Sequence, residues 1–257
     1  MNIYKINKIK ILKSSISICN SYQELYSYCI CNNSDLSKFI TLNNVHSTIE
    51  AFYNTNYKKA LDSAFIALPD GKPLSIVAKL KGHKDAIRIM GPTFMEKTLE
   101  WGQKDNIKHF FFGSLRETLK KIEYIIKSKY PASNIVGAIS PPFRTFTEAE
   151  NKTFLEQINK VNPDIIWVGL GAPKQEIWMY ENYKKLNRGI MIGIGAGFDY
   201  LAGNTKHAPE WMKNFSLEWL YRLIQEPKRL WKRYLVTNTL FLFLITLELL
   251  HIKNFKP

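Results

Sequence analysis

The chain has 257 residues, of which 46% are hydrophobic and 23% are charged, and its 36 basic against 22 acidic residues give a net charge of +14. This balance is that of a globular protein, and 13 glycines and 11 prolines are too few for a fibrous or low-complexity chain. Cys19, Cys29 and Cys31 form no CxxC pair, which excludes a zinc ribbon and argues against a disulfide scaffold. The positive charge favours an anionic partner: nucleic acid, a phosphorylated small molecule or an anionic membrane surface.

Short apolar runs alternate with helical patterns along most of the chain. The runs predict strands at Ile9–Leu12, Phe39–Leu42, Phe65–Leu68, Arg88–Met90, His109–Phe112, Ile135–Ala138, Ile165–Gly169 and Ile190–Ile194. Helical spacing predicts helices at Ser47–Asn54, Gly71–Leu80, Thr93–Lys104, Leu115–Lys129, Thr147–Val161 and Lys174–Lys185. The alternation predicts an α/β fold, a Rossmann-like parallel sheet with helices on both faces, and a ligand beyond the carboxyl ends of the strands.

The pattern changes after Gly203, where strands stop and Trp, Arg and Glu become frequent. The basic segment PKRLWKRY at 227–234 precedes Leu235–Leu250, an apolar stretch shorter than the roughly 20 residues that span a bilayer. We expect an α/β core at 1–203 and a C-terminal helical appendage at 204–257 that lies on an anionic membrane. Two alternatives for the apolar stretch at 235–250 are a helix packed on its own domain and a contact in a homo-oligomer. At the N-terminus, lysines interrupt the apolar residues, so no signal peptide is expected.

Two glycine-rich segments follow predicted strands. In the first, Gly169 and Gly171 precede a proline that opens a helix, which leaves Lys174 and Gln175 at the mouth of the turn. Glycines let the backbone approach a ligand, and a helix N-terminus favours an anion, so this segment predicts a phosphate or nucleotide site. The alternative is an ordinary tight turn. The second segment, GIGAGFD, ends at Asp199, where a carboxylate can accept hydrogen bonds from a ribose or a base.

Polar residues also end two other predicted strands. Asp70 follows one of them within the sequence LPDG, and we expect its carboxyl group to point into the crevice, although Asp-Gly is commonly only a turn. Thr41 and Asn43 end another strand and are expected to face the same crevice.

Several catalytic patterns are absent from the sequence. It contains no Asp-x-Asp pair, no Walker A motif, no GxSxG and no histidines at metal-ligand spacing. We therefore expect neither a metal nor a cofactor, and any diphosphate has to be held by arginine, lysine and helix N-termini. Arg88 is a candidate for this role, with a solvated surface charge as the alternative.

Taken together, these segments resemble the WecG/TagA/CpsF family of bacterial glycosyltransferases. The specific stretches are LPDG at 68–71, DIIWVGLGAPKQEIW at 164–178, and GIGAGFDYLAG, AP-x-W and LEWLYRLIQEPKRLWKRY within 193–234. The resemblance implies inverting transfer of N-acetylmannosamine, or a related hexose, hexosamine or uronic acid, from a UDP-sugar to a polyprenyl-diphosphate-linked sugar such as GlcNAc. It also implies a peripheral protein at the cytoplasmic face of the bacterial inner membrane, acting in cell-surface polysaccharide or teichoic acid synthesis.

The same resemblance assigns roles to individual residues. It makes Asp70 the general base and places Thr41 beside it in catalysis. The residues that it implies for the UDP-sugar are Asn43, Arg88, Gly169, Gly171, Lys174, Gln175 and Asp199. It also implies that the appendage at 204–257 closes over the site and that three of its residues engage the lipid diphosphate and the membrane, namely Arg222, Arg229 and Arg233. Two departures leave the sugars open: Gly91-Pro92-Thr93 stands where many members have Gly-x-Asp, and His207 stands where arginine is common.

Two other function classes remain. An NAD-dependent oxidoreductase is compatible with the glycine loops, but the GxGxxG fingerprint is missing. A non-enzymatic polybasic module that binds membranes or nucleic acid fits the charge. However, no nucleic-acid-binding motif is present, so we expect no nucleic-acid partner.

Overall fold

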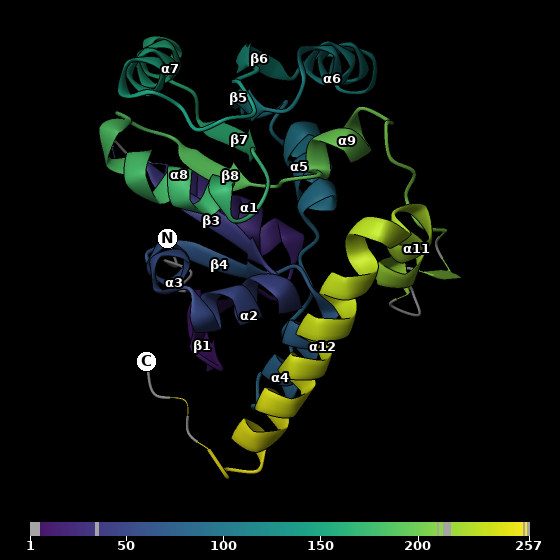
Figure 1. Cartoon of the computed structure of the whole chain (residues 1–257). Coiled ribbons are helices and arrows are strands. Elements are labelled where there is room, and N and C mark those ends of the chain that lie inside the picture. Colours follow the sequence, from purple (N-terminus) through teal and green to yellow (C-terminus); the bar gives the residue numbers. More distant parts are fainter. Residues whose placement is uncertain (1–5, 34–35, 210, 213–216, 254, 256–257) are drawn as a thin grey trace.

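A computed structural model describes residues 6–33, 36–209, 211–212, 217–253 and 255. Its centre is a six-stranded parallel sheet with the strand order β4-β3-β8-β7-β5-β6 (Figure 1). The strands are β3 (Lys38–Asn43), β4 (Ile66–Pro69), β5 (Lys108–Gly113), β6 (Asn134–Ile139), β7 (Ile165–Gly169) and β8 (Ile190–Gly193). This confirms the predicted α/β class.

Helices cover both faces of the sheet. On one face lie α1 (Tyr22–Cys31), α5 (Gly91–Trp101), α6 (Arg116–Lys129) and α9 (Gly197–Leu201). On the other lie α7 (Glu148–Val161), α8 (Lys174–Asn182) and the short η1 (Tyr183–Lys185) (Figure 1). Successive strand side chains point to opposite faces. Ile165 and Trp167 of β7 therefore pack on the first face, and Ile166 and Val168 on the second. Burial on both sides explains why the strands are continuous apolar runs.

A smaller layer lies beside β4. An antiparallel hairpin of β1 (Asn7–Ile11) and β2 (Ser14–Ile18) packs with α2 (Val45–Tyr53), α3 (Thr55–Asp62) and α4 (Lys72–Leu80). β2, α1 and α3 were not predicted from the sequence pattern. Asn54 explains the break between α2 and α3, because its side chain accepts a hydrogen bond from Tyr57 N at 3.0 Å and caps a new helix.

The predicted strand Arg88–Met90 is wrong. This segment is irregular and leads into α5. Its backbone N–H groups bind different elements, since Ile89 N donates to Pro69 O and Met90 N to the Tyr22 hydroxyl, so no ladder forms. The apolar alternation instead reflects the burial of Ile89, which is fully enclosed in the core.

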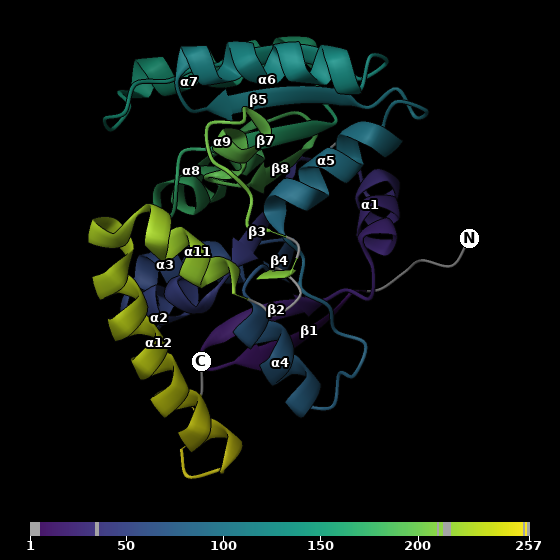
Figure 2. The same cartoon turned by 90° about the vertical axis from the view of Figure 1, so that its right-hand side faces the viewer.

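The C-terminal residues are helical, as predicted, and form α11 (Glu218–Gln225) and α12 (Pro227–Leu249). One side of α12 is buried, because Phe241, Leu244 and Ile245 pack with side chains of α2 and α4. Figure 2 shows α12 running along the lower layer of the molecule. Within the part of the chain that the structure describes, no helix is long and apolar enough to cross a membrane.

Candidate functional site

The candidate site lies where β3 and β4 end. Asp70 follows β4, and its backbone N–H donates to Asn43 O at 2.8 Å. The Asp70 carboxyl group accepts a hydrogen bond from the backbone N–H of Gly91, the first residue of α5. Arg88 reaches the same point, because its Nε donates to the Asp70 carbonyl oxygen. The strand end, the irregular 88–90 segment and the start of α5 thus converge on one residue, Asp70.

A cavity of about 260 Å³ opens beside Asp70. Its lining residues come from the loop after β4, the start of α5, α9, the 207–208 segment and α11. They are Asp70, Arg88, Met90, Pro92, Thr93, Glu96, Tyr200, His207, Ala208, Glu218, Tyr221 and Arg222. Of the predicted site residues, Asp70, Arg88 and Arg222 therefore share one cavity, although they are up to about 150 positions apart in sequence.

Burial raises the pKa of the Asp70 carboxyl group above its ordinary value, and the Glu218 carboxylate adds to this effect. The positive charges of Arg88 and Arg222 and the Gly91 N–H act in the opposite direction on the same pKa. A carboxylate with a raised pKa is a better proton acceptor near neutral pH than an exposed one. Asp70 thus has the surroundings of a general base.

Helix α11 forms one wall of the cavity. Glu218 makes an ion pair with Arg88, and Arg222 stands one turn further along the same helix face. Tyr200 of α9 lies nearby, and its ring centroid is 4.7 Å from that of His207. Burial raises the pKa of the Tyr200 hydroxyl, with Arg222 opposing, so this phenol stays protonated and can donate a hydrogen bond.

Sequence reasoning did not single out Glu218 or Tyr200. A signal for Glu218 was present, because the spacing of four residues from Arg222 places both on one helix face. Arg229 and Arg233 belong to α12, but their side chains lie outside what the structure describes.

Thr41 and Asn43 are not among the residues that line the Asp70 cavity, and they are 0% and 1% exposed. Alternation along β3 places both on the face that carries Phe39, which α8 covers. Among the described residues, neither the Thr41 hydroxyl nor the two Asn43 amide atoms find a hydrogen-bond partner. Buried polar groups are normally paired, so the unused hydrogen-bonding capacity of these atoms is unusual.

Gln175 connects the two glycine-rich loops. Its Oε1 accepts from Gly195 N at 3.0 Å, and its Nε2 donates to Glu176 Oε1 at 2.8 Å. The side chain is 4% exposed, so it is enclosed rather than at the mouth of the turn. Glu176 is equally buried, and burial raises its pKa to about 7, while the Gln175 amide and the Tyr57 hydroxyl act in the opposite direction.

Gly169 and Gly171, in the first glycine-rich loop, have structural roles. A Cβ on Gly169 would lie 2.7 Å from the Phe198 ring, so only glycine fits between β7 and α9. Gly171 has a φ of 78°, a left-handed conformation that favours glycine, and open space around it. The loop is therefore shaped by packing at one glycine and by a turn at the other.

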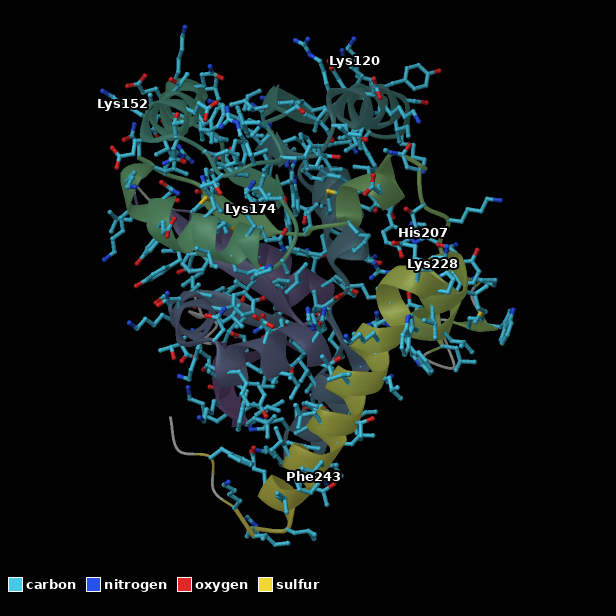
Figure 3. The ribbon with its side chains drawn as sticks, in the orientation of Figure 1. Lys120, Lys152, Lys174, His207, Lys228 and Phe243 are labelled. Atoms are coloured by element: carbon cyan, nitrogen blue, oxygen red, sulfur yellow. The ribbon has the colours of Figure 1, made fainter. Side chains whose placement is uncertain are left out.

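Lys174 and Asp199 are engaged outside the Asp70 cavity. Lys174 Nζ donates to Arg144 O at 2.8 Å and lies 4.4 Å from the centroid of the Phe146 ring. Figure 3 shows Lys174 well separated from His207, which lines the cavity. Asp199 Oδ1 accepts from Asn204 Nδ2 at 3.3 Å.

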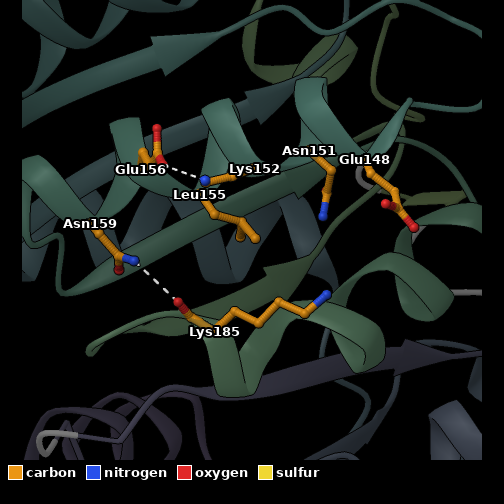
Figure 4. A pocket seen from close by; sticks show the side chains of 7 residues that line it. All are labelled: Glu148, Asn151, Lys152, Leu155, Glu156, Asn159 and Lys185. Atoms are coloured by element: carbon orange, nitrogen blue, oxygen red, sulfur yellow. Dashed lines mark hydrogen bonds and ion pairs between the residues drawn. The ribbon is translucent and has the colours of Figure 1, made fainter.

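A larger cavity, of about 400 Å³, lies between α7 and η1 (Figure 4). It is lined by Glu148, Asn151, Lys152, Leu155, Glu156, Asn159 and Lys185. Two of its side-chain amides bind neighbouring elements: Asn159 donates to Lys185 O, and Asn151 to Asn182 Oδ1. Its polar groups thus fasten α7 to α8 and η1, and the Asp70 cavity remains the candidate site.

A parallel sheet covered on both faces, with a carboxyl group and two guanidinium groups gathered at its carboxyl edge, places the chain among α/β proteins whose candidate ligand site lies beyond the ends of the strands. The model of the glycosyl transferase WecG/TagA/CpsF family matches residues 9–254, and the chain belongs to this family. The resemblance seen in the sequence is thereby confirmed.

Relatives in three bacteria share one name, N-acetylglucosaminyldiphosphoundecaprenol N-acetyl-beta-D-mannosaminyltransferase. The Bacillus subtilis protein is 33% identical over 186 residues, 72% of this chain and 70% of that protein. The Bacillus spizizenii protein is 31% identical over 197 residues, 77% and 74% of the two chains. A Staphylococcus aureus protein is 27% identical over 199 residues, 77% and 76%. These similarities favour a glycosyltransferase over the oxidoreductase and the non-enzymatic module.

Proposed function

We propose that this protein transfers N-acetylmannosamine, or a related sugar, from a UDP-sugar to GlcNAc carried on polyprenyl diphosphate. The observation that supports this most directly is the meeting of Asp70, Arg88 and Arg222 at one cavity. The names of the relatives support the sugar and the lipid-linked acceptor. We propose that the product belongs to a cell-surface polysaccharide or a teichoic acid.

The proposed reaction is a single displacement with inversion. The acceptor hydroxyl attacks the anomeric carbon of the donor sugar, its proton passes to an Asp70 carboxylate oxygen, and the bond to UDP breaks on the opposite side. The hydroxyl becomes far more acidic as the new bond forms, so a carboxylate suffices as the base. Thr41 and Asn43, with their unpaired buried polar atoms, are proposed to hold the sugar.

We propose that arginines stabilise the leaving diphosphate. Arg88 and Arg222 offer forked donors that match phosphate oxygens, in a partly enclosed cavity where charge interactions are strengthened. Within the described part of the chain, no three His, Cys, Asp or Glu side chains are grouped to hold a metal ion. We propose that the Arg88 and Arg222 guanidinium groups take the place of a metal ion at the diphosphate.

The remaining predicted residues complete the proposal. Gly169, Gly171 and Gln175 would shape the donor site. The side chains of Lys174 and Asp199 would have to move from their present contacts to reach its margin. Arg229 and Arg233 would engage the lipid diphosphate and the membrane. We retain 1–203 as the core and 204–257 as the appendage, with the qualification that α12 packs firmly on that core. The protein would act peripherally, at the cytoplasmic face of the inner membrane.

The test is a UDP-release assay with purified full-length protein, a panel of UDP-sugars and a GlcNAc-diphosphate-polyprenol acceptor. Acceptor-dependent release that survives EDTA and is lost in Asp70→Asn supports the proposal. Release that requires a divalent ion overturns the metal-free reaction. Release that the substitution leaves unchanged overturns the role of Asp70.

A further inference from the structure

Helix α4 has one buried side and one exposed apolar side. Leu74, Val77 and Ala78 are enclosed, whereas Ile76 is 47% exposed and Leu80 is 66% exposed. These two side chains are four positions apart, so they stand on the same outward face of the helix. The exposure of these two apolar side chains is not explained by packing within the described part of the chain.

The charged side chains of α4 itself have one sign. Lys72 and Lys79 are exposed on the outward side of α4, and the helix contains no acidic residue. Lysine stems can lie along apolar material while their ammonium groups stay in the polar layer above it. An apolar centre flanked by lysines is the pattern of a surface that lies in the headgroup region of an anionic bilayer.

The position of α4 links it to the active-site cavity and to α12. It begins two residues after Asp70, and at its other end the Lys81 side chain makes an ion pair with Glu248 of α12. Just beyond α12, Leu250 is 63% exposed and Ile252 is 68% exposed. Figures 1 and 2 both show α4 beside α12, on the side of the molecule away from α6 and α7. Exposed apolar side chains thus occur on α4 and just beyond the C-terminal end of α12.

We propose that the outward face of α4, formed by Lys72, Ile76, Lys79 and Leu80, is a contact surface for an anionic lipid bilayer. Ile76 and Leu80 enter the boundary of the acyl chains, and the two lysines pair with lipid phosphates. The contact holds the loop that carries Asp70 next to the leaflet in which a polyprenyl-linked acceptor resides. This last step rests on the proposed function, whereas the contact itself does not.

A second copy of the chain fits this face less well. In a two-fold contact, the lysines of one copy would face those of the other, and each chain already carries a net charge of +14. A negatively charged lipid surface compensates the same lysines.

The experiment is vesicle flotation of the full-length protein with phosphatidylglycerol–phosphatidylcholine vesicles. The double variant Ile76→Gln/Leu80→Gln should bind these vesicles about tenfold more weakly than the unaltered protein. The matched control is Tyr124→Gln, at a 76% exposed position on α6, which should bind as before. A second pair, Lys72→Gln/Lys79→Gln, removes only the electrostatic attraction and should lose the part of the binding that depends on phosphatidylglycerol.

Each outcome bears on the proposal. The proposal is overturned if both double variants float with the vesicles as the unaltered protein does. It is also overturned if the substitutions convert a dimer of the chain into monomers but leave vesicle binding unchanged. The same proteins are assayed with a short-chain, water-soluble acceptor, on which the α4 variants should match the unaltered protein. If no protein turns over either acceptor, the proposed function fails, while the flotation result still decides whether α4 contacts lipid.

Discussion

Arg88, in the segment that leads into α5, and Glu218, on α11, form an ion pair inside the cavity that contains Asp70. Both side chains are mostly enclosed, at 24% and 20% exposure. The pair joins the C-terminal helices to the edge of the sheet. The Glu218 carboxylate thereby occupies the Arg88 guanidinium, which we propose binds the substrate diphosphate. A bound diphosphate would compete with Glu218 for Arg88.

Glu218→Gln should change the pH dependence of the reaction. The Glu218 carboxylate raises the pKa of Asp70, so its neutralisation lowers that pKa and keeps the base ionised in more acidic solution. The acid limb of kcat/KM against pH should therefore move to lower pH. Arg88→Gln removes a charge that lowers the same pKa and should move the limb to higher pH. Shifts in the same direction for both variants would contradict this electrostatic account.

Asp70→Asn should reduce turnover by about 10²- to 10⁴-fold, the usual contribution of a positioned base. The amide keeps the shape of the side chain, so binding of UDP should persist. Calorimetric titration with UDP and the rate of sugar transfer measure the two effects separately. Loss of UDP binding together with turnover would mean that Asp70 holds the donor rather than accepting a proton.

Arg222→Lys should weaken the reaction although it keeps the positive charge. Lysine cannot form the two parallel hydrogen bonds that a guanidinium makes with a phosphate, so we expect about a tenfold loss in kcat/KM. Arg222→Gln should lose more, because the charge also disappears. Equal activity of the lysine variant and the unaltered protein would show that Arg222 acts only as a distant charge.

Glu176→Gln should remove a pH-dependent part of the stability. The pKa of Glu176 is about 7 in the folded protein and near 4.5 when unfolded, so the folded state retains the proton between these values. Stability should therefore fall as pH rises from about 4.5 to 7, by about 3 kcal/mol in total. The difference in free energy of unfolding between the two proteins should change in this window and be constant above it. A constant difference at every pH would contradict the raised pKa.

Gly169→Ala should destabilise the fold through a clash rather than by loss of a ligand contact. Its Cβ would meet the Phe198 ring, and such overpacking costs about 1–3 kcal/mol. Thermal unfolding of the unliganded protein should show the loss. The double variant Gly169→Ala/Phe198→Leu should recover part of it, because the smaller side chain makes room. No recovery would point to the backbone of the loop instead.

The sequence by itself predicted most of the sheet, for a physical reason. Strands buried on both faces must be apolar at every position, so β5, β7 and β8 stand out as continuous runs between helical patterns. The same reasoning gave a false strand at Arg88–Met90, because the burial of Ile89 produces the same apolar signal without a ladder. Asp70 was also predictable, since the carboxyl ends of parallel strands gather at one edge.

The tertiary structure alone decided which side chains meet Asp70. Arg88 and Arg222 were candidates in the sequence, but their approach to one carboxyl group depends on how α11 folds back onto the start of α5. Glu218 and Tyr200 join the site by the same long-range packing. Gln175, predicted at an open mouth, instead became an enclosed link to Gly195, because the two glycine loops lie side by side on neighbouring strands. The local pattern of apolar and polar residues determines which segments form strands or helices. Contacts between segments far apart in the sequence are determined only by the tertiary packing.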